Sequence, residues 1–191
     1  MAQKRELRTL ELSQDGTGVI AVISDTHGKP HARLFPCLEQ YRPSLILHAG
    51  DVGSLGLVME LERVSPTVYV RGNMDPTGPE WPDSVALTIK LGKTAQLDLL
   101  LLHIALARLK LNRTALNLLG QSPARLVVFG HSHVPFLGMD GKICLFNPGS
   151  AGPGRWALPT TLGLIQVSTE RLQFKHLDLR TGKEWKPGSS P

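Results

Sequence analysis

Seven side chains that carry oxygen or imidazole donors follow directly after apolar runs of this sequence. Each run has the character of a buried strand, and a buried strand has no structural reason to end in a carboxylate or an imidazole. The seven residues are Asp25, His27, Asp51, Asn73, His103, His131 and His133. Because ligands of open α/β sheets bind beyond the carboxyl ends of the strands, we expect these side chains to gather at one edge of a sheet.

The donor types in this set indicate divalent metal ions. Carboxylate, amide and imidazole ligands without a thiolate suit Mn²⁺, Fe²⁺, Zn²⁺ or Co²⁺. One octahedral ion takes about six donors, some of them water, so seven protein donors are too many for one ion and fit two. An aspartate can bridge two ions ~3.5–4 Å apart, and such a pair is suited to hydrolysis of a phosphate ester.

Taken one at a time, these motifs are weak signals. Gly-Asp and Gly-Asn are ordinary turn dipeptides, and a single Asp-x-His is common by chance. Gly130-His131-Ser132-His133 is more specific, since two imidazoles at this spacing after a buried strand are uncommon. The ordered occurrence of all the motifs, each after a strand, favours a functional interpretation over a purely structural one.

The elements that must position these residues form a β-α-β-α-β series followed by hairpins. Expected strands cover 18–24, 45–49, 67–70 and 125–129, and expected helices cover 31–41, a segment capped by Ser54, and 106–119. Turn residues at 92–93, 139–141 and 169–170 predict three hairpins. The series predicts parallel strands with right-handed crossovers. Together with the hairpins, it indicates an α/β (α+β) fold of two mixed sheets packed face to face, with helices outside.

Length and composition fit a single soluble domain. The chain has 191 residues, of which 41% are hydrophobic and 19% charged, and its net charge is +5. We expect a polar lead-in over 1–17, one domain over 18–180 and a flexible tail over 181–191. The oligomeric state stays open, and a homo-oligomer is compatible with the sequence.

The sequence gives no indication of a nucleic-acid or membrane partner. Its positive charge is spread rather than clustered, so nucleic-acid binding is not expected. The apolar stretches are far shorter than the ~20 residues of a membrane span. No signal peptide is visible, and Cys37 and Cys144 belong to no metal or disulfide pattern. A reducing, cytoplasmic setting is therefore expected.

The ordered motifs resemble those of the calcineurin-like metallophosphoesterases. They are Asp25-x-His27, Gly50-Asp51, Gly72-Asn73, His103 and Gly130-His131-Ser132-His133, and the likeness runs from about residue 18 to 180. It is strongest for the small bacterial and archaeal phosphodiesterase subfamily, to which the vacuolar-sorting subunit of retromer is related. Asn147-Pro148-Gly149-Ser150 followed by Arg155 resembles a further signature of that subfamily.

The resemblance implies a four-layer αββα sandwich and a binuclear metal centre, with a hydroxide that bridges the ions as the nucleophile. Asp25, His27 and His133 would hold the first ion. Asn73, His103 and His131 would hold the second, and Asp51 would bridge the two. We expect two Mn²⁺ ions, with Zn²⁺, Fe²⁺, Ni²⁺ or Co²⁺ as alternatives. The expected substrate is a small-molecule phosphate ester, in the first place a diester, with Asn73 and Arg155 as substrate-binding candidates.

The sequence departs from the family pattern beside two of the motifs. Met74 stands where many larger members have a histidine after Gly-Asn, so no general acid is assigned and a substrate with a good leaving group is expected. Ile104 follows His103 where the family usually has glycine. The alternative function is a non-catalytic scaffold on the same fold, which is the role of the related retromer subunit. Scaffolds can lose ligands, whereas this chain keeps a competent residue at all seven positions.

Three residues outside the seven have two interpretations each. His48 either orients a metal ligand from behind or points into the interface between a helix and the sheet. Arg71 and Arg155 either contact phosphate oxygens or are ordinary surface charges.

Overall fold

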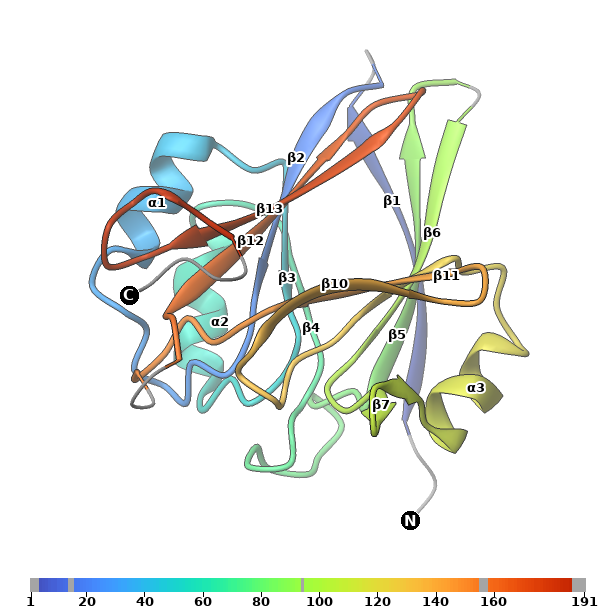
Figure 1. Ribbon diagram of the computed structural model, residues 1–191, viewed down its shortest axis with the longest axis horizontal. Helices are drawn as coiled ribbons and strands as arrows, with labels where there is room; N and C mark the ends of the chain where they lie inside the picture. The colour runs from blue at the N-terminus through green and yellow to red at the C-terminus, as the bar shows by residue number, and fades with distance from the viewer. Residues whose placement is uncertain (1–3, 14–15, 94, 155–157, 187–191) are drawn as a thin grey trace.

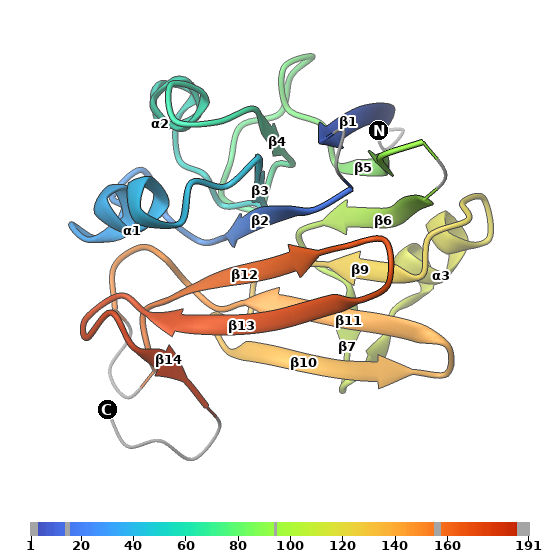
Figure 2. The same ribbon diagram turned by 90° about the horizontal axis from the view of Figure 1, so that it is seen from above.

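Two six-stranded mixed sheets pack face to face in the computed structural model, and helices cover their outer faces (Figures 1 and 2). The structure describes residues 4–13, 16–93, 95–154 and 158–186. One sheet has the strand order β14-β13-β12-β2-β3-β4, and the other has the order β1-β5-β6-β9-β11-β10. The predicted αββα sandwich of two mixed sheets is therefore confirmed.

The first sheet contains the predicted β-α-β-α-β series. Its strands are β2 (Gly18–Ile23), β3 (Leu45–His48), β4 (Thr67–Tyr69), β12 (Thr161–Val167), β13 (Leu172–Asp178) and β14 (Glu184–Trp185). Strands β2, β3 and β4 are parallel, and α1 (Leu34–Tyr41) and α2 (Leu55–Glu62) connect them. Ser54 caps α2 as predicted, since its side chain accepts a hydrogen bond from the Leu57 backbone N–H. The register pairs Ile23 with His48 and His48 with Tyr69, so the carboxyl ends of the three strands lie level.

The second sheet brings further carboxyl ends to the same region. Its strands are β1 (Arg5–Ser13), β5 (Ser84–Leu91), β6 (Ala95–Leu102), β9 (Leu126–Val128), β10 (Pro135–Asp140) and β11 (Ile143–Pro148). Strands β6, β9 and β11 run parallel to one another, although β9 and β11 are joined through the antiparallel β10. His103 therefore follows β6, and the Gly-His-Ser-His segment follows the parallel β9 beside it.

Three apolar clusters hold the four layers together. The cluster between the sheets includes Ile20, Leu47, Leu99, Val128 and Phe146. The second cluster packs α1 and α2 on the outer face of the first sheet, and the third packs α3 (Arg113–Leu119) on the second sheet. Strand β2 contributes Ile20 to the inner cluster and Ala21 to the outer one, so both of its faces are buried. This explains why β2 is continuously apolar rather than alternating.

The expectation of a helix over 106–119 is wrong in its first half. Residues Leu106–Ala107 and Lys110–Leu111 form the small hairpin of β7 and β8, and the helix begins only at Arg113. The turn between these strands has Arg108 at φ 51° and Leu109 at φ 66°, which an α-helix excludes. The Asn112 side chain caps α3 by accepting a hydrogen bond of 2.8 Å from the Ala115 backbone N–H. This cap fixes the start of the helix, which the spacing of the leucines alone did not locate.

Both chain ends contain strands where the sequence predicted none. The predicted lead-in over 1–17 contains β1, which pairs in parallel with β5 at the edge of the second sheet. Leu10 and Leu12 pack partly against the inner cluster, whereas Leu7 is exposed, so this strand is held by few apolar contacts. The predicted tail over 181–191 contains β14, paired with β13, and residues 187–191 lie outside the described part. Among the described helices, none has the length and apolar character needed to cross a membrane.

Candidate metal centre

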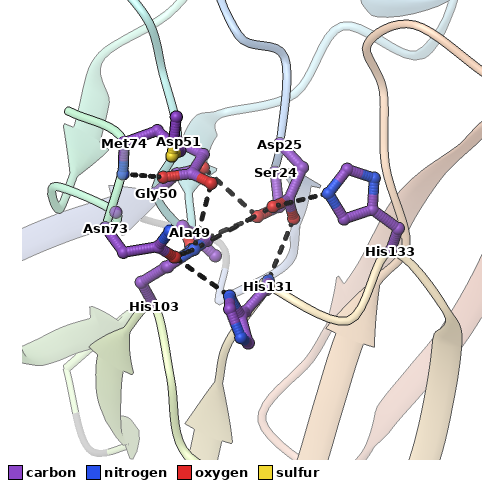
Figure 3. Close-up of polar contacts among 12 residues, drawn as sticks. Ser24, Asp25, Ala49, Gly50, Asp51, Asn73, Met74, His103, His131 and His133 are labelled. Carbon is purple, nitrogen blue, oxygen red and sulfur yellow. Dashed lines mark hydrogen bonds and ion pairs between the residues drawn. The ribbon is translucent and has the colours of Figure 1, made fainter.

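All seven predicted ligands lie within the described residues, at the shared edge of the two sheets. Asp25 and His27 follow β2, Asp51 follows β3, and Asn73 follows β4. His103 follows β6 of the second sheet, and His131 and His133 follow β9. Figure 3 shows Asp51 and His133 on opposite sides of Asp25, with Asn73, His103 and His131 nearby. Each sheet therefore contributes donors to one cluster.

A first group of donors consists of Asp25, His27 and His133. One donor atom from each residue lies within 4.8 Å of the other two. His133 Nε2 is 3.2 Å from Asp25 Oδ1, and the rings of His27 and His133 stack with their centroids 5.5 Å apart. Asp25 is completely buried.

Two donor atoms of this group lack hydrogen bonds. Within the described part of the chain, Asp25 Oδ1 and His27 Nε2 are buried and form no hydrogen bond, and the 3.2 Å approach of His133 Nε2 to Asp25 Oδ1 is a charge contact without hydrogen-bond geometry. A buried polar atom without a partner costs about 1–3 kcal/mol. A cation would satisfy the carboxylate oxygen and the imidazole nitrogen together, so this group fits a divalent ion.

A second group consists of Asp25, Asp51 and His103, whose donor atoms also lie within 4.8 Å of one another. Asp51 Oδ2 is 3.4 Å from His103 Nε2 and 4.0 Å from His27 Nε2, so this oxygen stands between the two groups. Asp25 belongs to both groups as well, with its Oδ1 4.0 Å from His103 Nε2. Two carboxylates thus face the middle of the site, where the family resemblance implied a shared role for Asp51 alone.

Asn73 joins the remaining histidine to the second group. Its Oδ1 lies 3.2 Å from His103 Nε2 and 3.0 Å from His131 Nδ1. One amide oxygen and two imidazole nitrogens therefore converge on one point. This set complements the carboxylates and fits a second divalent ion.

The electrostatics of the cluster keep its carboxylates ionised. Burial raises the pKa of Asp51, but hydrogen bonds from His103 and from the Met74 backbone N–H outweigh it and lower this pKa to about 2. Burial likewise raises the pKa of Asp25, and its contacts with His133 and Ser24 reverse the effect and lower the pKa. Both groups are therefore anionic at neutral pH, the state that binds a cation.

The backbone at the donors is strained in a way that aims their side chains. Asp25, His27 and Asp51 have φ angles of 55°, 50° and 51°, and His131 and His133 have 70° and 59°. Non-glycine residues in the left-handed region are uncommon and cluster at functional sites. Backbone hydrogen bonds hold the first loop against the second, from Asp25 N–H to the Gly50 carbonyl and from His27 N–H to the Asp51 carbonyl, each 2.9 Å long.

Gly72 is one of the positions where a side chain would collide with the site. A Cβ atom added there would overlap the Asp51 carboxylate and the Asp51 backbone nitrogen. Only glycine therefore allows the loop after β4 to approach Asp51 this closely.

The orientation of His103 is set from behind by the backbone. Its Nδ1 lies 2.7 Å from the Ala49 carbonyl oxygen, to which it donates, so its Nε2 is left free to face the carboxylates. Burial lowers the pKa of His103, but Asp51, Asp25 and the Ala49 carbonyl outweigh it and raise this pKa. Ile104 in place of the usual glycine has not displaced His103, which stays 3.4 Å from Asp51 Oδ2.

His48 orients the loop between two donors. It is fully buried, and its Nε2 lies 2.8 Å from Thr26 Oγ1. The Thr26 hydroxyl donates its single hydrogen to the Val52 carbonyl, so His48 Nε2–H must donate to Thr26. Burial lowers the pKa of His48 to about 4, which keeps the ring neutral. Since Thr26 lies between Asp25 and His27, the first of the two interpretations of His48 is favoured.

Asp75 is a functional residue that the sequence did not single out. Its Oδ2 accepts hydrogen bonds from the backbone N–H groups of Val52 (2.9 Å) and Gly72 (2.8 Å). Its Oδ1 accepts from Gly53 N–H at 2.7 Å. The carboxylate thus ties the loop of Asp51 to the loop of Asn73. Its signal in the sequence is an acidic residue two positions after the asparagine of Gly-Asn.

The Asn-Pro-Gly-Ser signature supports the loop that carries His131 and His133. The Asn147 side chain donates from Nδ2 to the Gly130 carbonyl (2.8 Å) and to Ser132 Oγ (3.1 Å). Ser150 Oγ donates to the Asp25 carbonyl at 3.0 Å. Arg155, the substrate-binding candidate that follows this signature, lies outside the described residues.

Met74 and Arg71 border the cluster without adding a donor to it. The Met74 side chain is 71% exposed, and its backbone N–H donates to Asp51 Oδ1 at 2.9 Å. Arg71 Nε donates to Asp83 Oδ1 at 2.6 Å, which fixes the guanidinium near Asn73. The thioether of Met74 cannot donate a proton, so the position after Asn73 supplies no acid.

A family model and a curated relative each match most of this chain. The family model described as the calcineurin-like phosphoesterase superfamily domain matches residues 19–170. A protein of Methanothermobacter thermautotrophicus named a probable metallophosphoesterase is 32% identical over 169 residues, which cover 86% of this chain and 93% of that protein.

Solved structures share the fold at lower identity. Vacuolar protein sorting 29 from Cryptosporidium parvum superposes with a TM-score of 0.69 at 20% identity, over 90% of this chain and 96% of that one. A structure described as a novel archaeal phosphodiesterase gives a TM-score of 0.59 at 18% identity, over 83% of this chain and 98% of the other.

Proposed function

We propose that this chain, which belongs to the calcineurin-like phosphoesterase superfamily, is a phosphodiesterase that depends on two divalent metal ions. The observation that carries the proposal is the position of Asp51 Oδ2, between His27 Nε2 at 4.0 Å and His103 Nε2 at 3.4 Å. A carboxylate oxygen placed between two separate donor groups is suited to binding an ion on each side. The archaeal phosphodiesterase with the same fold makes a diester the substrate to test first.

The proposed ligand sets follow the two groups of donors. Asp25, His27 and His133 would hold one ion, Asn73, His103 and His131 would hold the other, and Asp51 would be shared between them. Mn²⁺ is the proposed metal, because the donors are oxygen and imidazole with no thiolate. Two such ions would polarise the phosphate and supply a water of lowered pKa for in-line attack on phosphorus.

The side chains around the site set the requirements for the substrate. Hydrolysis breaks the bond from phosphorus to one ester oxygen, and the departing oxygen carries negative charge unless a proton reaches it. Met74 offers no proton at the position after Asn73. A diester whose leaving group is a weak base, such as an aryl oxide, is therefore the proposed class of efficient test substrate. Asn73, an exposed residue at the edge of the cluster, is placed to contact a phosphate oxygen as well.

The test is hydrolysis of bis(p-nitrophenyl) phosphate by the purified protein with Mn²⁺ and with EDTA. We expect turnover only with the metal, and two ions per chain by elemental analysis. Asp51→Ala should lower kcat/KM by well over tenfold. The control is Asp98→Asn, which should leave kcat/KM unchanged, because the native Asp98 carboxylate binds only Thr88 and Gln96 among the described residues, on the second sheet. A loss of less than about tenfold in Asp51→Ala would contradict the two-metal proposal.

The alternative function is a non-catalytic scaffold. It is favoured by the likeness to vacuolar protein sorting 29, although identity of 20% supports the fold alone. The complete set of seven donors argues against it. Two bound ions without any turnover of phosphomonoesters, phosphodiesters or cyclic nucleotides would favour the scaffold. The enzymatic proposal includes a small-molecule substrate and a cytoplasmic setting.

A further inference from the structure

Two cavities of different character border the candidate metal centre. The polar cavity, of about 330 Å³, is lined by Asn73 and His103 and, further out, by Arg71, Asp83 and Thr114. The apolar cavity, of about 360 Å³, is lined by His131 and Ser132 and, further out, by Leu106, Leu109, Phe129 and Phe136. Each cavity therefore contains a proposed metal ligand in its wall, so a group bound in either one lies next to the candidate metal centre.

Ile104 stands in the walls of both cavities. It follows His103 directly and is 39% exposed. The family pattern usually has glycine at this position, which would leave no side chain between the cavities. Ile104 therefore separates the space around the metal centre into two compartments. A phosphodiester bound here would have its two ester groups on opposite sides of Ile104.

The polar cavity is suited to a neutral group that forms hydrogen bonds. Its cation is already paired, because Arg71 Nε lies 2.6 Å from Asp83 Oδ1, so the two charges largely cancel. An additional anion would gain little from a guanidinium that is compensated in this way. The Thr114 hydroxyl makes no hydrogen bond within the described part of the chain, and Ser84 Oγ is buried without a partner there. Hydroxyl groups of a ligand can both donate to and accept from such side chains.

The apolar cavity offers mainly aliphatic and aromatic surface, and the polar side chains in its lining are those of Arg108, His131 and Ser132. The β7–β8 hairpin forms one wall with Leu106 and Leu109, and Phe129 and Phe136 form another, with their ring centroids 6.4 Å apart. Leu109 is 76% exposed at the turn of the hairpin. Removing exposed apolar surface of this kind from water favours binding of an apolar group. The sequence predicted a helix from residue 106, but α3 begins only at Arg113. The hairpin that forms this wall occupies the residues before it.

We propose that the substrate is a phosphodiester joining a neutral hydroxylated group, such as a polyol or sugar, to an apolar group. The hydroxylated group occupies the polar cavity, the apolar group occupies the apolar cavity, and Ile104 keeps the two apart. This inference rests on the proposed phosphodiesterase function and names the substrate class for that site. A diester with two apolar groups fits the pair of cavities less well.

The test compares p-nitrophenyl diesters that share one leaving group. Glyceryl p-nitrophenyl phosphate carries the hydroxylated group, and ethyl p-nitrophenyl phosphate replaces it with a short alkyl group. We expect kcat/KM with Mn²⁺ to be at least fivefold higher for the glyceryl diester. Thr114→Val, which removes one hydroxyl at constant volume, should lower this ratio at least fivefold, and Thr114→Ser should retain it.

The apolar cavity is tested by a charge placed in its wall. Leu109→Asp should lower kcat/KM for both diesters at least fivefold, because the aryl group then meets a carboxylate. Leu116→Asp is the matched control, since Leu116 is 54% exposed on α3 and lines neither cavity. Thermal melting of each variant excludes unfolding as the cause. Equal kcat/KM for the two diesters in the native protein, or an unchanged rate in Leu109→Asp, would overturn the inference.

A failure of the proposed function is distinguishable from a failure of this inference. If no diester is hydrolysed, the phosphodiesterase proposal fails. Calorimetric binding of the same two diesters then still tests which group each cavity binds. Tighter binding of the glyceryl diester, lost in Thr114→Val and weakened in Leu109→Asp, supports the assignment of the two groups. Equal affinity for both diesters refutes it.

Discussion

The carboxylate of Asp75 accepts a hydrogen bond of 2.9 Å from the backbone N–H of Val52, the residue that follows Asp51. The same oxygen accepts from Gly72 N–H, and the second oxygen accepts from Gly53 N–H. Asp75 therefore holds two donor loops in register without belonging to the donor cluster itself. It is a positioning residue, and its loss should act on metal binding before it acts on chemistry.

The first prediction concerns Asp75. Asp75→Ala leaves three backbone N–H groups without their acceptor, so the loops of Asp51 and Asn73 should lose their fixed separation. We expect Mn²⁺ affinity to fall about 10–100-fold, as for other groups that orient metal ligands. Calorimetric titration with Mn²⁺ measures this directly, with Asp98→Ala as the control. Native affinity in Asp75→Ala would show that the loops keep their geometry without this carboxylate.

The second prediction concerns metal removal. The native state presents the buried donor atoms Asp25 Oδ1 and His27 Nε2 together, whereas the unfolded chain does not, so ions should bind the native state alone. At a free Mn²⁺ concentration of 100 times Kd, binding adds about 2.7 kcal/mol of stability. For a chain of this size, that raises Tm by roughly 5–10 °C relative to EDTA.

The same melting experiment has a built-in comparison. The Mn²⁺-dependent shift should be clearly smaller in His133→Ala, which removes a ligand of one ion, and should persist at full size in Asp98→Asn. A shift of equal size in all three proteins would mean that the ions bind elsewhere.

The third prediction concerns Gly72. In Gly72→Ala, the added methyl group overlaps both the carboxylate and the backbone nitrogen of Asp51, and the backbone atom cannot rotate out of the way. We expect kcat/KM to fall at least tenfold and the free energy of unfolding to fall by about 1–3 kcal/mol. Gly141→Ala is the control for added strain, since Gly141 has φ +59° with nothing within 4 Å of the added atom. Its activity should stay at the native level, and a native rate in Gly72→Ala would contradict the crowding at Asp51.

The fourth prediction concerns pH and His48. Burial lowers the pKa of His48 to about 4; nearby Asp75 and Asp25 raise it and His103 lowers it further. In the unfolded chain the pKa is about 6.5. The unfolded state therefore takes up the proton first as pH falls, and stability present above pH 6.5 is lost progressively down to about pH 4. At pH 5 the loss from this residue is about 2 kcal/mol.

Urea unfolding in EDTA at several pH values isolates this effect. His48→Gln keeps an N–H donor for Thr26 but does not titrate, so its stability should fall less between pH 7 and pH 5 than that of the native protein. The other histidines are common to both proteins and cancel in the difference. Parallel pH profiles would show that His48 is protonated as readily in the folded state as in the unfolded one.

Much of the donor cluster was predictable because its signals are local in the sequence. Asp25, Asp51 and His103 each follow an apolar run that can be identified without knowing the fold, and parallel strands bring such ends to one edge. The two-sheet sandwich followed from the βαβ series and the hairpins.

The remaining features depend on contacts between distant segments. Strand β1 is stabilised by pairing with β5, and its own composition shows only a weak alternation. The β7–β8 hairpin depends in part on the hydrogen bond of 3.0 Å from Leu111 N–H to Asp140 Oδ2. The role of Asp75 appears only when the loops after β3 and β4 lie together. A pattern within a single window cannot report any of these contacts.

The division of the donors between the two sheets has a mechanical consequence. The first sheet supplies Asp25, His27, Asp51 and Asn73, and the second supplies His103, His131 and His133. Even without ions, the hydrogen bond from His131 N–H to Asp25 Oδ2 joins positions 106 residues apart in the chain. Ions bound here would act as a cross-link between the sheets and would close long loops as a disulfide does. The protein's rigidity and its chemistry would then depend on the same bonds, and a chelator would loosen the sandwich at the edge where catalysis takes place.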